Sequence, residues 1–452
     1  MINFIKRQPP VRIIAFGFLF TILFGSLLLI MPFSLQNGVK LDYIDALYTS
    51  TSAVCVTGLI TVDTGLTFTA FGHTILAILI QIGGLGVSTV GAGIILAIGK
   101  KMNLKGANII KEASNLDSGK GLRNFIKNIF MMTLIIELIG AILSFIVFIP
   151  KMEFSQALGV SLFHSIASFN NSGFDIFSST NNFGAFQSLA AHQNNVFLLL
   201  ITSGLIISGG IGFLVIKDII VKKFKWKKFS MHTKVVLSMT LFLLISGTLL
   251  IKLTEDIDWL NAFFNSVSTR TAGFATVPLS SFSSATLLIV VILMFIGASP
   301  GSTGGGVKTT TIFSLVQGVK SAATNRSEKA FKYSMPKNAF KKASVIVFIA
   351  LSVILIGTYL ILVFEKNTLI PQGVKNSGTT VTTMDALFEM TSAFGTVGLS
   401  TGITPYLSIG SKIISMLIMF VGRLGPLTIA SLWYFSRRET FRYPEGNIAI
   451  GW

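Results

Sequence analysis

The chain of 452 residues contains one cysteine, Cys55, and four histidines. A single thiol excludes an intramolecular disulfide framework and a cysteine metal cluster. The histidines do not pair at the spacing of a metal site; they are His73, His164, His192 and His232. The sequence therefore predicts no metal-dependent catalytic centre and no cofactor bound by this chain.

Charged residues are also scarce, at 12% of the chain. A soluble domain carries roughly 25%. Hydrophobic residues make up 51%, and the mean hydropathy is +0.74. This composition is typical of an integral membrane protein and excludes an ordinary soluble domain.

Acidic residues are outnumbered, with 18 Asp and Glu against 36 Lys and Arg, which gives a formal net charge of +18. The basic residues gather in five places, and the acidic residues lie mostly in the segments between them. The positive-inside rule then makes the basic segments cytoplasmic and predicts that both termini are cytoplasmic. The basic places are Lys6 to Arg12, residues 100–127, 217–234 and 320–342, and Arg437 to Arg442.

One basic stretch, KKFKWKKF at residues 222–229, mixes cations with aromatic side chains. RNA-binding segments share this composition. Beside a membrane-spanning helix it favours contact with anionic lipid headgroups, so we expect membrane lipids rather than nucleic acid as the partner.

Eight long apolar runs predict eight membrane-spanning helices, since each run can supply about 20 residues. An even number of spans agrees with two cytoplasmic termini. The first run has no clear cleavage site after it, which predicts a retained helix rather than a signal peptide. The runs begin near Ile13, Phe71, Ile129, Val196, Val235, Ala285, Val345 and Ile413.

Between the two runs of each pair lies a shorter segment that has the pattern of an amphipathic helix leading into a glycine. These segments are YIDALYTSTSAVCVTGL, ALGVSLFHSIASFNNSGF, IDWLNAFFNSVSTRTAGF and MDALFEMTSAFGTVGL, with Gly58, Gly173, Gly273 and Gly398 near their ends. The glycines recur every 100 to 125 residues, roughly, which predicts an internal repeat. We expect an all-α polytopic fold with four helix–pore loop–helix repeats, at residues 1–100, 101–230, 231–330 and 331–452.

Four re-entrant segments can surround one axis, because irregular backbone at membrane depth is stable only beside protein or water. Carbonyl oxygens of four extended strands can then replace the hydration shell of a cation. Glycine adopts the backbone angles that such strands need and places no side chain in the pathway. Each short helix would direct its negative C-terminal end toward the ion.

With these motifs the chain resembles the Trk/Ktr/HKT superfamily of potassium transporters, and most closely the membrane subunit of bacterial Ktr systems. The resemblance covers nearly the whole chain. It rests on VTGL, NSGF, TAGF and TVGL at the four glycines, and on IQIGGLG (80–86), ISGGIGF (207–213), residues 297–311 and FVGRLGPLT (420–428).

The resemblance implies a potassium uptake protein of the bacterial plasma membrane, often stimulated by sodium as a coupling or activating ion. It also implies a homodimer and a cytoplasmic ring of regulatory subunits with nucleotide-binding (RCK-type) domains. Glycine at all four filter positions resembles the potassium-preferring members, since serine at the first marks sodium-preferring ones. The filter residues are Val56, Thr57, Gly58, Asn171, Ser172, Gly173, Thr271, Ala272, Gly273, Thr396, Val397 and Gly398.

The loop GASPGSTGGGVKTTT, residues 297–311, interrupts the sixth apolar run. A phosphate-binding loop requires lysine directly after its second glycine, but Val307 follows Gly306 and the lysine is Lys308. The family places an intramembrane gate here, and a static kink for helix packing is the other interpretation. The candidate gate residues are Gly301, Ser302, Thr303, Gly304, Gly305, Gly306 and Lys308.

Several charged residues fall inside apolar segments, where they normally pair or face a cavity. In the family the arginine at Arg423 lies near the pore, where it would act as a barrier to cations; a structural arginine bonded to helix ends is the alternative. Glu137 has Arg423 and Lys308 as candidate partners. Arg270 is expected to brace the filter from behind. For Asp45 and Asp385 we expect helix capping rather than cation attraction at the pore mouth.

The sequence thus predicts potassium uptake through a gated pore. A sodium or poorly selective monovalent cation pathway is the alternative within transport. A nucleotide-hydrolysing pump is disfavoured, because the chain lacks a phosphate loop, a phosphorylated-aspartate motif and a soluble domain of adequate length.

Overall fold

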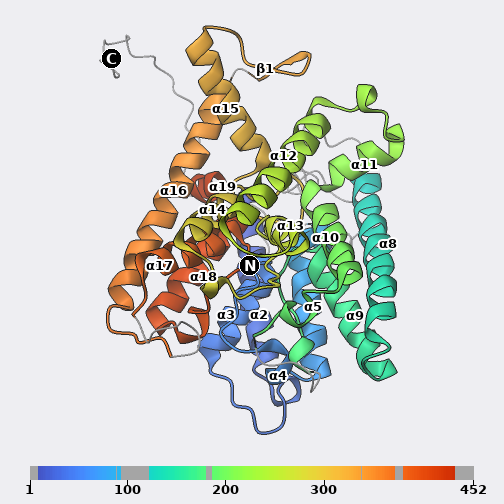
Figure 1. Ribbon diagram of the computed structural model, residues 1–452, viewed down its shortest axis with the longest axis vertical. Coiled ribbons are helices and arrows are strands. Elements are labelled where there is room, and N and C mark those ends of the chain that lie inside the picture. The colour runs from blue at the N-terminus through green and yellow to red at the C-terminus, as the bar shows by residue number, and fades with distance from the viewer. Residues whose placement is uncertain are drawn as a thin grey trace.

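The computed structural model describes residues 9–87, 89–92, 122–179, 186–336, 338–371 and 380–432. The regular elements of this part of the chain are helices, joined by loops, apart from a short hairpin of β1 (Lys329–Ala330) and β2 (Tyr333–Ser334). Figure 1 shows α15 (Thr309–Thr324) and the hairpin at one end of the helix bundle and α4 (Thr64–Thr67) at the other. The prediction of an all-α fold is therefore confirmed.

Among the described residues, four helices are long and apolar enough to cross a membrane: α2 (Pro10–Leu29), α8 (Leu122–Phe148), α12 (Met231–Thr254) and α16 (Ala339–Phe364). Their outward side chains remain exposed, for example Phe20 at 69%, Phe242 at 63% and Phe348 at 73%. Water would penalise such surfaces and lipid tails would not, so these faces fit a hydrocarbon surrounding. In Figure 1, α16 and α8 lie at opposite sides of the bundle.

Each long helix is followed along the chain by a shorter helix whose C-terminal half is buried. These are α3 (Tyr43–Cys55), α9 (Phe154–Phe169), α13 (Trp259–Ser268) and α17 (Thr383–Gly395). The residue five positions before each glycine is small, and Ala53 and Ala393 are two of these residues; all are fully buried. Short side chains allow the four helix ends to approach one another closely.

The second helix of each pair is shorter than the 20 or so residues that the apolar runs led us to expect. These helices are α5 (Ala70–Leu85), α10 (Val196–Ile211), α14 (Ser284–Phe295) and α18 (Ile409–Leu424). Three of them end at a glycine with positive φ: Gly86 at 85°, Gly212 at 93° and Gly425 at 90°. The chain then continues in a new direction, and α10 meets α11 (Phe213–Lys222) at a bend of 100°.

The sequence interpretation placed a break only in the sixth run, after α14. The structure adds breaks at three matching positions, with α11 and α19 (Pro426–Leu432) beyond two of them. By length and composition four helices, or five with the bent pair, qualify as spans in the described part. The count of eight spans and the boundaries of the four repeats stay predictions.

A second glycine, three residues before each of these breaks, explains how the helices reach the centre of the bundle. A Cβ at Gly83, Gly209 or Gly422 would lie 2.2, 1.9 or 1.9 Å from a backbone oxygen. Those oxygens belong to Val54, Phe169 and Phe394, near the C-terminal ends of α3, α9 and α17. Only glycine permits this contact between backbones.

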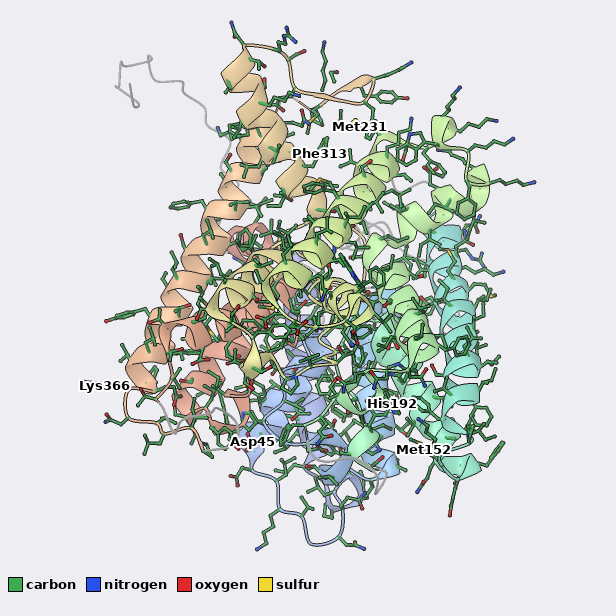
Figure 2. The ribbon with its side chains drawn as sticks, in the orientation of Figure 1. Asp45, Met152, His192, Met231, Phe313 and Lys366 are labelled. Atoms are coloured by element: carbon green, nitrogen blue, oxygen red, sulfur yellow. The ribbon has the colours of Figure 1, made fainter. Side chains whose placement is uncertain are left out.

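The two ends of the bundle agree with the sidedness that the charges predict. Figure 2 shows Met231 and Phe313 near one end, and Asp45, Met152, His192 and Lys366 near the other. The first end carries the described parts of the basic segments 217–234 and 320–342. The predictions for residues 1–8, 93–121 and 433–452, which include both termini, lie outside the described residues.

The remaining turns are short: η1 (Pro32–Ser34), η2 (Phe177–Ser179), η3 (Ala190–His192), η4 (Trp226–Lys228), η5 (Leu279–Ser281) and η6 (Thr404–Tyr406). Residues of η3, η5 and η6 lie around the four glycines, in a pocket described below.

Candidate functional site

The four glycines predicted from the repeat form a closed ring. A Cβ at Gly58 would lie 2.9 Å from the Cα of Gly173, and one at Gly173 would lie 3.0 Å from the Cα of Gly273. A Cβ at Gly273 would be 3.2 Å from the Cα of Gly398, and one at Gly398 would return to Gly58 at 2.9 Å. Segments separated by 100 or more residues thus meet around one centre.

Each glycine also faces the carbonyl oxygen of the residue before the next glycine in the ring. A Cβ would lie 2.3 Å from the oxygen of Ser172, 3.0 Å from that of Ala272, 2.4 Å from that of Val397 and 2.2 Å from that of Thr57. Backbone oxygen therefore surrounds the ring on every side. No L side chain fits at these positions without displacing a neighbouring strand.

The backbone repeats the same conformation in all four segments. The glycines have φ of 91°, 70°, 81° and 93°. The residues two positions earlier also have positive φ: Val56 at 58°, Asn171 at 58°, Thr271 at 73° and Thr396 at 50°. Positive φ is uncommon outside glycine and rarest for β-branched residues, which three of these four are. Its recurrence at matched positions indicates a specified backbone conformation rather than loop irregularity.

Hydrogen bonds to the short helices hold these strands in place. Ser52 Oγ accepts from the Gly58 amide at 2.9 Å, and Ser392 Oγ accepts from the Gly398 amide at 3.1 Å. The helix ends that lead into the ring carry the negative end of the helix dipole, which favours a cation at the centre. The twelve residues predicted as a filter are all brought together here.

The loop after α14 lies directly below this ring. Thr303 Oγ1 donates to the carbonyl of Phe169 at 3.2 Å, and the Gly305 amide donates to Thr396 Oγ1 at 3.0 Å. The Thr303 amide donates to the carbonyl of Gly209 at 3.3 Å. The loop therefore contacts the ends of α9 and α17 and the break after α10. The amides of Ser299, Thr303 and Gly305 have protein acceptors, which disfavours a phosphate cradle.

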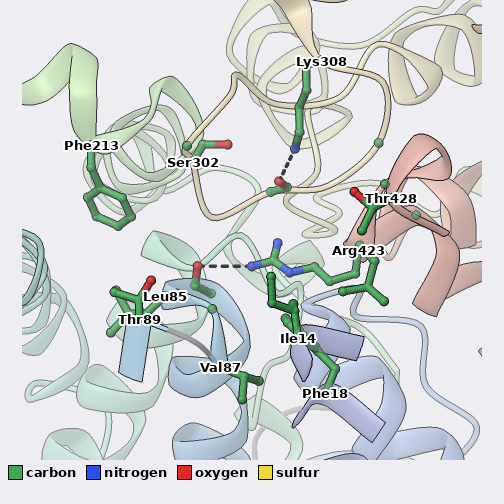
Figure 3. Close-up of a pocket in the computed structure, with 18 of the residues that line it drawn as sticks. Ile14, Phe18, Leu85, Val87, Thr89, Phe213, Ser302, Lys308, Arg423 and Thr428 are labelled. Carbon is green, nitrogen blue, oxygen red and sulfur yellow. Dashed lines mark hydrogen bonds between the residues drawn. The ribbon is translucent and has the colours of Figure 1, made fainter. Parts of the chain in front are cut away.

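Two cations hold the loop from below. Lys308 Nζ donates to the carbonyls of Gly304 at 2.7 Å and Gly305 at 3.3 Å. Arg423 donates to the carbonyls of Thr303 and Gly83, and to that of Gly84 at 3.1 Å. Figure 3 shows both side chains entering the same pocket. Arg423 thus joins the loop to the exposed carbonyls at the end of α5.

That inner pocket has a volume of about 310 Å³. Its described lining includes Gly86, Gly301, Gly304 and Gly425, and its charged residues are Lys308 and Arg423. Figure 3 shows apolar side chains of Ile14, Phe18 and Phe213 around it. The breaks in the second helices of three pairs and the loop therefore border one cavity, which carries positive charge.

A second pocket lies on the opposite side of the ring and measures about 560 Å³. All four ring glycines line it, together with residues of η3, η5 and η6. Asp175 is the charged residue among its described lining. The ring thus separates an outer pocket with a carboxylate from an inner pocket with two cations.

Arg270 lies away from both pockets. It is buried, and its Nη2 donates to the carbonyl of Gly297 at 3.4 Å, where the loop begins. The brace that the sequence led us to expect would therefore act between the third strand of the ring and the loop.

Glu137 pairs with neither of the cations that the sequence left as candidates. Its carboxylate accepts from Asn170 Nδ2 at 3.0 Å and from Gln81 Nε2 at 3.3 Å. Arg423 and Lys308 instead use backbone carbonyls. Glu137 belongs to a polar cluster that joins α8, α5 and the end of α9.

Replacing Glu137 by Ala should lower the thermal stability of the purified protein, because the amides of buried Asn170 and half-buried Gln81 each lose one acceptor. We expect a loss of about 1–3 kcal/mol. Glu137→Gln retains one acceptor oxygen and should lose less. Glu153→Ala is the control, since Glu153 is exposed and makes no side-chain cap bond at the start of α9. Equal melting temperatures for Glu137→Ala and Glu153→Ala would contradict this role.

The expectation of helix capping is confirmed for Asp385 and wrong for Asp45. Asp385 and Thr382 form a reciprocal capping box at the start of α17. Asp45 instead forms an ion pair of 2.6 Å with Lys412 of α18. An acid in the first turn favours a cap, but a buried lysine nearby offers a full opposite charge.

Sequence reasoning missed the glycines that bring the second helices to the ring. The signal was present as a repeated G-x-x-G: Gly83 with Gly86, Gly209 with Gly212, and Gly422 with Gly425. The first glycine of each pair permits the backbone contact and the second adopts the positive φ at the break. Lys412 was also missed, because its partner lies 367 residues away.

Comparison with known proteins identifies the family. A model of the TrkH family, described as a cation transport protein, matches residues 18–255 and 233–436. The potassium/sodium uptake protein NtpJ of Enterococcus hirae is 36% identical over 461 residues, 99% of this chain and 98% of that protein. The Ktr system potassium uptake protein B of Bacillus subtilis is 34% identical over 465 residues, which cover 100% of this chain and 98% of that protein.

Among solved structures, the potassium transporter TrkH from Vibrio parahaemolyticus matches with a TM-score of 0.67 and 18% identity. The match covers 92% of this chain and 84% of that one, and it supports the fold. The expected resemblance is thereby confirmed, and so is the expectation of a multi-pass membrane transporter. The chain belongs to the TrkH family of cation transport proteins.

Proposed function

We propose that this protein takes up potassium through a pore whose selectivity filter is the ring of Gly58, Gly173, Gly273 and Gly398. The observation that carries this proposal is the closed contact of the four glycines with four backbone oxygens. Carbonyl oxygen replaces the hydration shell of a monovalent cation, and a site made of backbone has a fixed size. The names of the relatives from B. subtilis and E. hirae support potassium as the ion.

A sodium or poorly selective monovalent cation pathway is the second candidate, and it is favoured by the words potassium/sodium in the name of the E. hirae relative. Flux of potassium, rubidium and sodium into liposomes that contain the purified protein separates the two. Potassium and rubidium should exceed sodium. Equal rates for all three ions would favour the second candidate.

The loop between α14 and α15 has the position and the composition of a gate. Its glycines lie directly below the ring, and its contacts with Thr396, Gly209 and Arg423 use single hydrogen bonds that an alternative conformation could release. Gly301 and Gly306 both have φ of 68°, so the loop can change direction at either end. Glycine hinges without large side chains suit a segment that must cross an ion path.

Regulation would act from the cytoplasmic end. The basic stretch 222–229 and the hairpin of β1 and β2 form one surface, because the rings of Trp226 and Phe331 lie 6.1 Å apart. Lys234 Nζ lies 6.0 Å from the centre of the Phe331 ring. The hairpin follows α15, which begins where the candidate gate ends. This surface suits both anionic lipid and a regulatory ring with nucleotide-binding domains. The functional unit would be a homodimer, and sodium would act as an activating ion.

Arg423→Ala should raise the maximal potassium flux several-fold, roughly 3- to 10-fold if the lost barrier is about 1 kcal/mol. The variant removes a positive charge from the inner pocket, one hydrogen bond to the loop at Thr303 and two to the end of α5. Arg423→Lys keeps the charge and is the matched control. Flux is measured in liposomes, with elution on gel filtration as a check on folding. A well-folded Arg423→Ala protein with unchanged flux would leave Arg423 a purely structural role.

A further inference from the structure

In each of the four segments the ring glycine is followed by Leu or Phe, and the residue after that lies on the outer side of the ring. In the four segments this residue is Ile60, Asp175, Ala275 or Ser400. All four line the outer pocket. The repeat therefore places one carboxylate, on the second segment, at a position that is apolar or neutral in the other three.

The carboxylate of Asp175 accepts only one hydrogen bond from the described residues. Oδ1 accepts one long bond of 3.4 Å from the Phe177 amide. The backbone carbonyl of Asp175, rather than its side chain, accepts from Thr64 Oγ1. The adjacent residues 180–185, TNNFGA, carry no charge in the sequence. No lysine or arginine lines the described part of this pocket.

The neighbouring Asp63 has a different role. One oxygen of its carboxylate accepts from the Leu66 amide at 2.9 Å and from Ser178 Oγ, and the other accepts from the Phe186 amide at 2.8 Å. Asp63 therefore caps α4 and fixes the loop behind the pocket. Its presence beside Asp175 concentrates negative charge at the rim without entering the pocket.

We propose that Asp175 is a cation-attracting site that holds a hydrated monovalent cation in the outer pocket immediately before it enters the ring. The proposal rests on the transport function proposed above and adds a residue to it. A single carboxylate beside a glycine-lined opening raises the local concentration of cations. The ion remains hydrated, because the pocket of about 560 Å³ is far larger than a dehydrated monovalent ion.

The charges of the outer and inner pockets differ in sign, which gives ion entry a preferred direction. Outside the ring the described lining carries Asp175, and inside it carries Lys308 and Arg423. A cation is attracted on the outer side and meets positive charge on the inner side. Such a field favours occupancy from outside when the external ion is dilute, which is the condition in which an uptake protein must work.

The proposal predicts a change in apparent affinity rather than in maximal rate. Asp175→Asn keeps the shape of the side chain and removes its charge. In liposomes at low ionic strength, the half-saturating potassium concentration should rise roughly 3- to 10-fold while the maximal flux is retained. Adding choline chloride should shrink the difference, because salt screens the attraction. Asp175→Glu should restore the affinity.

External pH provides a second measurement. Burial in the pocket, and secondarily the nearby Asp63 carboxylate, raises the pKa of Asp175 to about 7. The carboxylate is charged above that pH and neutral below it, so the half-saturating concentration of the wild type should rise as the external pH falls through 7. Asp175→Asn should lose the part of this step that Asp175 contributes. The other titratable groups around this pocket are Asp63, His73, Tyr406, His192 and Glu389, which accepts from Ser400 and Thr404 of the lining.

A matched control separates the pocket from general surface charge. Asp256 also lies on the outer side, is fully exposed and sits 4.0 Å from Lys252, outside the pocket lining. Asp256→Asn should leave the half-saturating concentration unchanged. An equal rise for Asp256→Asn and Asp175→Asn would overturn the proposal, and so would a fall in maximal flux alone for Asp175→Asn, which indicates a structural residue.

Failure of this proposal differs from failure of the proposed function. If wild-type protein shows no saturable potassium flux, the transport function fails. If wild-type flux is selective and Asp175→Asn retains wild-type affinity at low ionic strength and at every pH, the filter stands and the cation-attracting site is wrong.

Discussion

A chain that lacks Gly304, Gly305 and Gly306 should transport potassium faster than the wild type, even without a regulatory subunit. The deletion removes both carbonyl acceptors of Lys308 on the loop and the bond from the Gly305 amide to Thr396 Oγ1. The shortened loop also spans less of the cavity below the ring. We expect a rise of roughly tenfold, equivalent to about 1.4 kcal/mol of barrier.

The four ring glycines should keep their contacts, because each lies against a neighbouring strand, although the side chains of Thr271 and Thr396 lose contacts with the loop. The deletion variant should therefore retain the wild-type ratio of potassium to sodium flux. Its elution on gel filtration and its helix content should match those of the wild type. Folded protein with wild-type flux would refute the gate and favour a static kink. Loss of all flux would favour a loop that binds a ligand needed for activity, and a nonselective rise would indicate damage to the filter.

The ring was predictable from the sequence because it depends on a repeated local rule. A short buried helix, a small residue and a glycine recur four times, and the structure gives the same positive φ at each glycine. Repetition converts four weak local signals into one strong signal. The order of the segments around the ring also follows their order in the chain.

The breaks in the second helices were not predicted, because hydropathy does not register a change of direction. The residues on both sides of Gly86, Gly212 and Gly425 are apolar, so each run is continuous in composition. What ends the helix is a glycine with positive φ, and the reason for the break is contact with a distant pore helix. Such contacts are set by tertiary packing, which the apolar pattern does not contain.

The partners of the buried charges were also beyond the sequence. A carboxylate and a guanidinium in apolar segments suggest an ion pair, as was considered for Glu137 and Arg423. The structure instead gives Arg423 the free carbonyls at the end of α5. A helix end exposes acceptors of this kind, and a break inside the membrane creates an additional end. Because the break at Gly86 was not expected, its carbonyls could not be counted as partners.

Asp45 and Asp385 show the same limit within one fold. Both precede their ring glycine by the same number of residues and occur in the first turn of a short helix. Thr382 lies three residues before Asp385, so a capping box was available locally. The equivalent position before Asp45 is Asp42, which gives no side-chain cap. The ion pair with Lys412 then decides the orientation of Asp45.

Replacing Gly58 by Ser should reduce the preference of the pore for potassium over sodium. A Cβ at this position would lie 2.3 Å from the carbonyl oxygen of Ser172 and 2.9 Å from the Cα of Gly173. One strand must therefore move, and the hydroxyl would add a donor and acceptor where the wild type presents only backbone. A distorted ring no longer matches the size of the dehydrated potassium ion. We expect the ratio of potassium to sodium flux to fall roughly tenfold, or about 1.4 kcal/mol.

The control for this substitution is Gly38→Ser. Gly38 has φ of 81°, close to the 91° of Gly58, but a Cβ there would meet nothing within 4 Å. It therefore imposes the same backbone strain on a side chain without touching the ring. Flux ratios are measured with potassium and sodium in the same liposomes. A tenfold fall for Gly58→Ser with a wild-type ratio for Gly38→Ser would assign selectivity to the ring, whereas unchanged ratios in both folded variants would remove Gly58 from the filter.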